Sequence, residues 1–197
     1  PEVFGLLALM ELNASRAAAR IDARGEPILL LEQNRALWDQ LQIRRGLQAL
    51  HRAHELGGAE GNYALQAAII ACHARAVTAD ETNWQRIAAL YGELAALTPS
   101  PVVELNRAVA VSMAEGPQAA LATLDRLAGE PLLKNYHLLP TVRGDLLHKL
   151  GRYEEAHAAF ETAAGLTGNI REHDLLKRRA AESASAAISS SSNTKQD

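Results

Sequence analysis

The stretch GDLLHKLGRYEEAHAAFETAAGL, residues 144–166, decides the fold. Its pattern is that of one helix–turn–helix unit of a helical repeat. Gly144 stands where such a unit needs a small residue for close helix contact, and Gly151 supplies the turn between the helices. At the spacing that the second helix requires, small and aromatic residues follow: Ala156, Phe160 and Ala163. One unit cannot bury its own apolar face, so the stretch predicts neighbouring units.

The repeat period is that of tetratricopeptide repeats. Tyr91, Leu124 and Phe160 are 33 and 36 residues apart, close to the roughly 34-residue period of that architecture. The sequence therefore predicts an all-α fold, a stack of helical hairpins with tetratricopeptide-like repeats. We expect these repeats over residues 61–182, after an N-terminal helical segment (1–60) with a short loop or hairpin near 20–31. Residues 183–197 have little apolar content, which predicts a disordered tail.

Composition agrees with packed helices. The chain has 197 residues, of which 48% are hydrophobic but only 4% are aromatic. Alanine and leucine supply the apolar content, and alanine both favours helix and lets helices approach closely. Start signals for helices are expected in the capping box at residues 78–81 and in Ser100–Pro101.

The helix expected at residues 2–18 is apolar all round in its first half, which predicts that this half is buried. It would anchor the chain, either into its own stack or onto a preceding domain, and Leu7→Asp would then unfold or detach the domain. The residues concerned are Val3, Phe4, Leu6, Leu7 and Met10. This apolar run is too short to span a bilayer, so no membrane partner is expected.

Charge and cysteine content exclude several classes of protein. The net charge of −3 argues against a nucleic-acid surface, because phosphate binding needs a clustered positive field. The single Cys72 rules out an internal disulfide framework and indicates a reducing, cytoplasmic setting.

No motif predicts catalysis. His51, His54 and Glu55 lie together, but a metal site needs a further ligand, and two surface histidines are the simpler interpretation. Cys72 and His73 are neighbours on a helix and point about 100° apart, so they are not expected to act as a pair. A phosphate-binding glycine loop, a serine nucleophile elbow and a CxxC pair are absent from the sequence. We therefore expect no catalytic residue, no metal site and no cofactor.

Four polar residues are candidates for partner binding. Asn106 and Arg107 lie on the first helix of a predicted repeat, the helix that lines the concave face of such stacks. Arg143 and Asp145 occupy comparable places one repeat on. They could hold a partner's carboxylate or backbone. The alternative, slightly favoured, is that they bridge adjacent repeats within the chain.

Five phrases in order resemble one family. They are PEVFGLLALM, LLLEQNRALWD, YALQAAIIACHA, PSPVVELNRAVAV and LLHKLGRYEEAHAAFETAAGL. Together they are similar to the C-terminal tetratricopeptide-like extension of a group of bacterial extracytoplasmic-function RNA polymerase sigma factors. The resemblance covers about residues 1–182. The second phrase usually carries an acidic residue at the position of Asn34.

The resemblance implies a function for the whole protein, which is to direct core RNA polymerase to promoters. Domains that read the promoter and bind polymerase would precede Pro1, and DNA would be contacted through them alone. This chain would be a non-enzymatic regulatory domain that contacts its own sigma domains, core RNA polymerase or a regulator. Two alternatives stay open: a free-standing scaffold that binds a peptide, and a small helical enzyme that uses His51 and His54.

Overall fold

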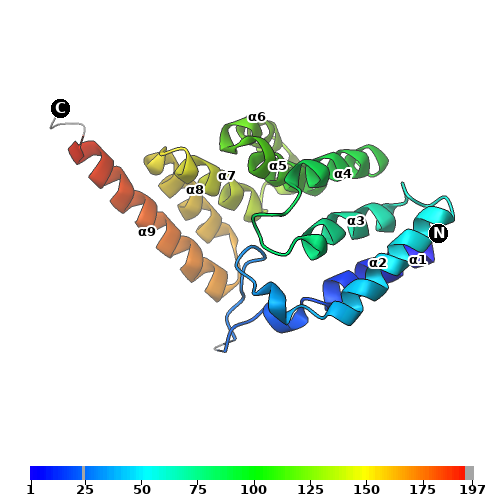
Figure 1. Ribbon diagram of the computed structural model, residues 1–197. Helices are drawn as coiled ribbons and strands as arrows, with labels where there is room; N and C mark the ends of the chain where they lie inside the picture. The colour runs from blue at the N-terminus through cyan, green and yellow to red at the C-terminus, as the bar shows by residue number, and fades with distance from the viewer. Residues whose placement is uncertain (24, 194–197) are drawn as a thin grey trace. The chain divides into compact units, whose positions relative to one another are not determined.

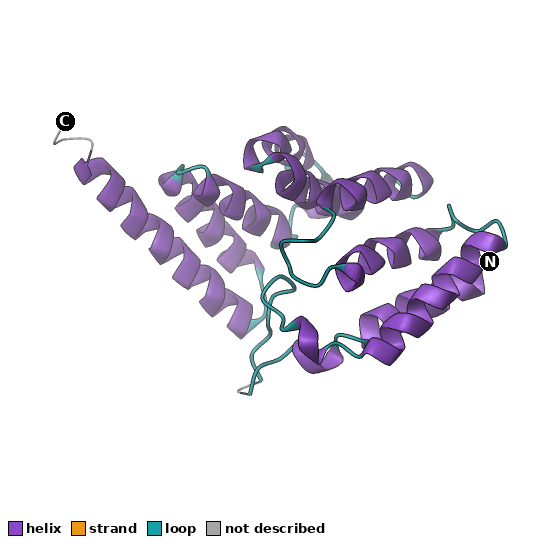
Figure 2. Cartoon of the chain, in the orientation of Figure 1, coloured by secondary structure: helices purple, strands orange, loops and turns teal. Residues whose placement is uncertain are grey.

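The computed structural model describes residues 1–23 and 25–193. Regular structure in these residues is helical, apart from one isolated bridge between Ile21 and Pro27, so the expected all-α class is confirmed (Figures 1 and 2). The α-helices are α1 (Glu2–Ala14), α2 (Gln40–Glu55), α3 (Asn62–Arg75), α4 (Trp84–Leu97), α5 (Pro101–Glu115), α6 (Pro117–Leu127), α7 (Leu138–Lys149), α8 (Tyr153–Leu166) and α9 (Ile170–Asn193). Single 3-10 turns are η1 (Ala17–Ala19), η2 (Arg35–Leu37) and η3 (Pro131–Leu133).

The chain forms two compact units, an N-terminal unit of Pro1–Pro99 and a C-terminal unit that begins at Ser100. The boundary between these units lies after Pro99, whereas the sequence predicted a division after residue 60. In the N-terminal unit, α1 packs against both α2 and α3, and α3 packs against α4. Glycines allow these approaches: a Cβ added at Gly5 would lie 2.9 Å from the backbone nitrogen of Ala64, and one at Gly46 would lie 2.7 Å from Cγ of Leu12. Such long-range contacts bind α3 to the N-terminal helices, and periodicity does not reveal them.

Helix α4 begins later than the capping box at residues 78–81 predicts. Its N-cap is Asn83, whose side chain accepts a hydrogen bond from the Arg86 nitrogen at 2.9 Å. Residues 76–83 form a loop instead of a helical turn. Arg35 accounts for this, because its guanidinium donates to the Ala76 carbonyl and to the Thr82 hydroxyl and so holds both ends of the segment.

The C-terminal unit consists of two helical hairpins and a last helix. α5 packs against α6 and α7 against α8, while α6 contacts α7 and α8 contacts α9. Pro101 opens α5 after Ser100, as predicted, although the Ser100 side chain makes no capping bond. The turn residues Gly116 and Gly151 have φ values of 97° and 73°, which glycine adopts without steric cost. Short connections make the helices of each hairpin antiparallel.

Contact between α7 and α8 is closest at Gly144. A Cβ there would lie 2.7 Å from Cε1 of Phe160, whose side chain is fully buried. Ala156 and Ala163, one turn to either side of Phe160, are also fully buried. Tyr91, Leu124 and Phe160, which defined the repeat period, lie on the second helices of the hairpins α3–α4, α5–α6 and α7–α8.

Helix α9 continues past the point where the sequence predicts disorder. The tail expected at 183–197 is helical as far as Asn193, and residues 194–197 lie outside the described part of the chain. Ser183 is fully buried and its hydroxyl lies 2.9 Å both from Nδ1 of His148 and from the Arg179 carbonyl oxygen. Ser185 and Ser189 likewise donate to carbonyls four residues back. These bonds satisfy the serine hydroxyls within the helix, and the contact of Ser183 with His148 holds this part of α9 against α7.

We expect Gly144→Ala to lower the free energy of unfolding by roughly 1–3 kcal/mol, because its methyl group would overlap the buried Phe160 ring. Gly165→Ala in α8 is the matched control. Nothing lies within 4 Å of its added Cβ, so this variant should be unchanged or more stable by about 0.5–1 kcal/mol. Urea unfolding of both variants measures the difference. Equal stability of the two would contradict the close helix contact.

Candidate functional site

One face of α1 is apolar and exposed to solvent. Val3, Leu6, Leu7 and Met10, called the α1 stripe below, are 79%, 38%, 44% and 61% exposed. Gly5, Ala8 and Leu12 form the buried face. The expectation that the first half of this helix is buried is therefore wrong. Close packing on α2 and α3 selects the face that carries small residues, and the larger side chains are left outside.

The α1 stripe has the spacing by which one helix contacts another surface. Its members stand at i, i+3, i+4 and i+7, so they form a single row along the helix. A contiguous exposed row of large apolar side chains is typical of a protein-binding site, and helices that dock by such a row lie in an apolar groove of their partner. Fully burying one such side chain contributes roughly 1.5–3 kcal/mol, more than the roughly 0–1 kcal/mol of a surface ion pair.

Two of the four residues predicted to bind a partner form bridges within the C-terminal unit. Arg143 on α7 pairs with Asp125 on α6. Asp145 on α7 pairs with Arg179 on α9. Both residues therefore fit the alternative interpretation, in which they form bridges within the chain.

The other two predicted residues, Asn106 and Arg107, are exposed on α5. Arg107 lies 3.5 Å from the carboxylate of Glu104 on the same helix. A role in binding a partner stays a prediction for this pair.

The Asp145–Arg179 ion pair joins α9 to α7. Burial raises the pKa of the Asp145 carboxyl, and the neighbouring Arg179 opposes that shift. The Arg179 guanidinium also lies 4.7 Å from the centre of the Phe160 ring, where it covers the aromatic side chain that packs on Gly144. α9 thus closes the end of the hairpin stack.

The histidine and cysteine candidates make separate contacts. His51 is exposed, with its Nε2 atom 3.3 Å from the Glu55 carboxylate on the next turn. Cys72 is half-buried, and burial raises the pKa of its thiol. The His73 ring packs against Trp84 instead, with centroids 5.2 Å apart. Among the described residues, no group of three or more His, Cys, Asp and Glu side chains is placed to bind a metal ion.

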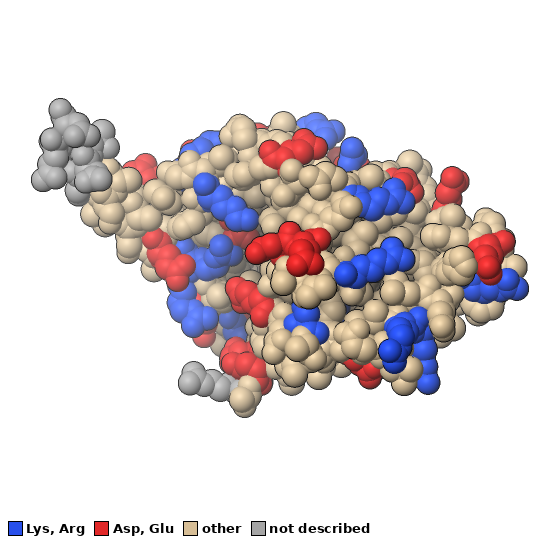
Figure 3. All heavy atoms as spheres, in the orientation of Figure 1, with Lys and Arg blue, Asp and Glu red and all other residues tan. Residues whose placement is uncertain are grey.

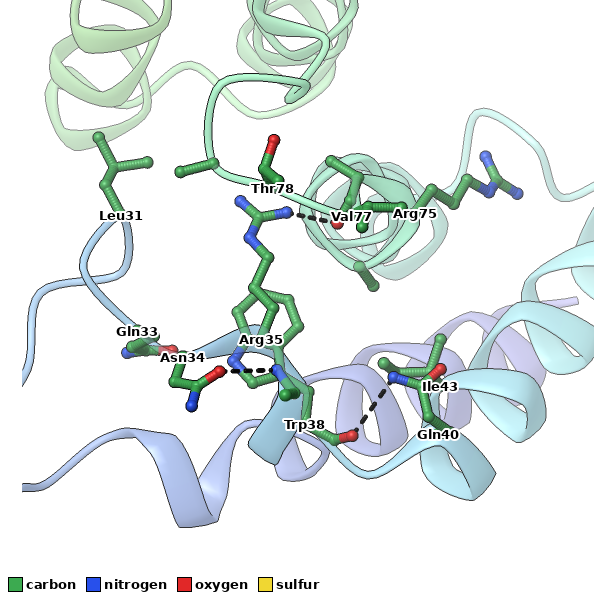
Figure 4. Close-up of a pocket in the computed structure, with 14 residues that line it drawn as sticks. Leu31, Gln33, Asn34, Arg35, Trp38, Gln40, Ile43, Arg75, Val77 and Thr78 are labelled. Carbon is green, nitrogen blue, oxygen red and sulfur yellow. Dashed lines mark hydrogen bonds between the residues drawn. The ribbon is translucent and has the colours of Figure 1, made fainter.

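Arg35 is a central contact that sequence reasoning missed. Its guanidinium donates to the carbonyls of His73 (2.6 Å) and Ala76 (2.8 Å) and to the Thr82 hydroxyl (3.0 Å), as Figure 4 shows in part. A cation bonded to the last carbonyls of a helix complements its dipole. The guanidinium also lies 5.1 Å from the centre of the Trp38 ring. The phrase LLLEQNRALWD contains both residues. The hydrogen-bond partners of Arg35 are 38, 41 and 47 residues further along the chain, and the sequence does not identify them.

The face drawn in Figure 3 carries charged side chains of both signs. Basic and acidic residues are interspersed over it. Within the part of the chain that the structure covers, no helix is long and apolar enough to cross a membrane.

Comparison with known proteins finds a family match to part of the chain and a similar protein. Residues 1–54 match a family of unknown function (DUF6596). The chain is 48% identical over 172 residues to the uncharacterized protein R00370 of Rhizobium meliloti (strain 1021). The match covers 87% of this chain and 40% of the relative, so the chain spans two fifths of that protein's length. No solved structure matches.

His73 makes stability depend on pH. Burial, together with the positive charges of Arg35 and Arg16, lowers the pKa of His73 from 6.5 to about 4. Between these values the unfolded chain binds a proton that the folded chain does not, so stability falls as the pH drops through this window. We expect His73 to account for a loss of roughly 3 kcal/mol at most.

The variant His73→Phe should remove this share of the pH dependence. It keeps a ring against Trp84 and has no Nδ1, an atom buried without a partner in the described part of the chain. The exposed His51→Phe is the control and should keep the wild-type slope. Urea midpoints measured from pH 7 to pH 4.5 test this. If all three proteins lose stability in parallel, His73 does not cause the effect.

Proposed function

We propose that this chain is a regulatory domain of an RNA polymerase sigma factor, a cytoplasmic protein of transcription initiation, and that it acts by protein contact without catalysis. The α1 stripe carries the proposal. A row of apolar side chains on an otherwise well-packed helix gives the domain a surface that another helical domain can cover. The resemblance of five ordered phrases to sigma-factor extensions supports the choice of partner.

The length of the relative also supports a domain within a larger protein. This chain matches two fifths of the Rhizobium meliloti protein, so that relative has room for further domains. In our proposal the α1 stripe docks on the sigma domains or on core RNA polymerase and alters their activity. Contact with DNA is left to the domains outside this chain.

A free-standing peptide-binding scaffold is the second candidate. Exposed Arg107 lines a hollow of about 270 Å³ between α5 and α6, together with Arg126 and the acidic Glu104 and Glu115. A peptide carboxylate could pair with Arg107 there. This alternative places the contact on α5 and leaves the α1 stripe unused.

Leu7→Asp distinguishes the two candidates. Leu7 is exposed, so the variant should unfold within about 0.5 kcal/mol of wild type. In the docked protein its charge would be buried in an apolar contact, which costs several kcal/mol. We expect promoter-dependent transcription by the full-length protein to shift to the level seen when this domain is deleted.

The matched control is Leu132→Asp, at a side chain that is 80% exposed on η3. It makes the same chemical change away from the α1 stripe and should transcribe as wild type. Transcription that is unchanged by Leu7→Asp would overturn the proposed docking. If Arg107→Ala changes transcription and Leu7→Asp does not, the peptide-binding scaffold is favoured.

A further inference from the structure

Helix α2 (Figure 1) presents a row of exposed side chains with apolar ends and a cationic middle. Its members, called the α2 row below, are Leu41, Arg45, Gln48, Arg52 and Leu56, the last of which directly follows the helix. Successive members are three or four residues apart, so they share one face. Leu41 and Leu56 are 49% and 42% exposed. Another side of α2 is fixed in the core, where Gly46 packs on Leu12 of α1.

Positive charge is concentrated on α2. The helix contains Arg44, Arg45 and Arg52, and Glu55 is its single acidic residue, although the net charge of the chain is −3. That glutamate is already shared, because it pairs with Arg52 at 2.8 Å and lies 3.3 Å from His51. The helix therefore has more guanidinium groups than carboxylates to pair with them.

Arg44 and Arg45 have no ionic partner within the described part of the chain. Both side chains are exposed, and neither forms an ion pair or a side-chain hydrogen bond with a described residue. Their helical neighbours three and four residues away are Gln, Leu and Ala, so the helix offers them no carboxylate. Cations without a counter-charge on an exposed helix face favour contact with an acidic group from outside the chain.

We propose that the α2 row binds an acidic helix of a partner protein. Arg45 and Arg52 are seven residues apart, which places them about 10.5 Å apart along the axis. Carboxylates seven residues apart on a partner helix would match them. An apolar residue one turn outside each carboxylate would cover Leu41 at one end and Leu56 at the other. Paired helices combine apolar contacts with flanking charges that set orientation in this way.

A protein helix suits the α2 row better than a nucleic-acid backbone does. Phosphates would pair with the arginines, but they would leave Leu41 and Leu56 without an apolar partner. The net negative charge of the chain also opposes binding to a polyanion. The proposal does not depend on the sigma-factor assignment or on the α1 stripe, because it concerns a different helix of the N-terminal unit.

Calorimetric titration of the full chain with synthetic helical peptides tests the proposal. The first peptide is alanine-based and about 20 residues long, so that it can form a helix. It carries leucine, glutamate, glutamate and leucine at the spacing of Leu41, Arg45, Arg52 and Leu56. A matched peptide has glutamine in place of both glutamates. We expect the glutamate peptide to bind at least about tenfold more tightly at low salt. No binding of this peptide at millimolar concentration, or equal binding of the two, would overturn the proposal.

Charge reversal at Arg45 locates the binding. Arg45 is exposed, so Arg45→Glu should fold as wild type, and it should weaken binding of the glutamate peptide about tenfold or more. A third peptide, with arginine in place of both glutamates, should bind Arg45→Glu more tightly than it binds wild type. The control is Arg178→Glu on α9, at another exposed arginine that forms no ion pair with a described residue. Equal affinities of the two variants for the glutamate peptide would contradict the assignment to α2.

A short DNA duplex is the probe for the other class of partner. We expect it not to bind the chain at physiological ionic strength, because two free guanidinium groups neutralise few phosphates. If the duplex binds more tightly than the glutamate peptide and Arg45→Glu abolishes that binding, the α2 row is a nucleic-acid contact and the proposal is wrong.

Discussion

A phenylalanine ring against a glycine is the contact on which the C-terminal unit depends. Phe160 can be fully buried only because residue 144 has no side chain, and α7 and α8 approach closely there. The ring then needs a cover on its other side, which Arg179 of α9 provides. Each hairpin thus leaves a surface that the next helix must bury, as repeat architectures require. Helix α9 continues beyond residue 182, where the repeats were expected to end. Polar contacts of Asp145 with Arg179 and of His148 with Ser183 hold it against α7.

The same rule of small residues explains the surface of the N-terminal unit. Gly5 and Ala8 let α1 lie close to its neighbours, and Leu12 fits against Gly46. Because this face of α1 is buried in the core, the larger apolar side chains of the α1 stripe lie on the exposed side of the helix. The α1 stripe is therefore a consequence of how the core is packed, and it supplies the apolar surface from which we infer a docking function.

Local signals in the sequence identified the helices and turns well. The hairpin at residues 144–166, the glycine turns and the proline that opens α5 follow from rules that act over a few residues. The predictions that differ from the structure concern features that depend on long-range contacts. The face of α1 that is buried, the placement of α3 in the N-terminal unit and the loop before α4 each depend on a partner about 30 to 60 residues away.

The chain contains two methionines, and their oxidation tests the central claim most directly. Met10 belongs to the exposed α1 stripe, and Met113 is half-buried on α5. Mass spectrometry after brief peroxide treatment would compare this chain alone with the full-length protein that carries the proposed sigma domains. Docking predicts that Met10 oxidises rapidly in the chain alone and slowly in the full-length protein, while Met113 reacts at the same rate in both. Equal oxidation of Met10 in the two proteins would show that the α1 stripe stays uncovered and would contradict the account.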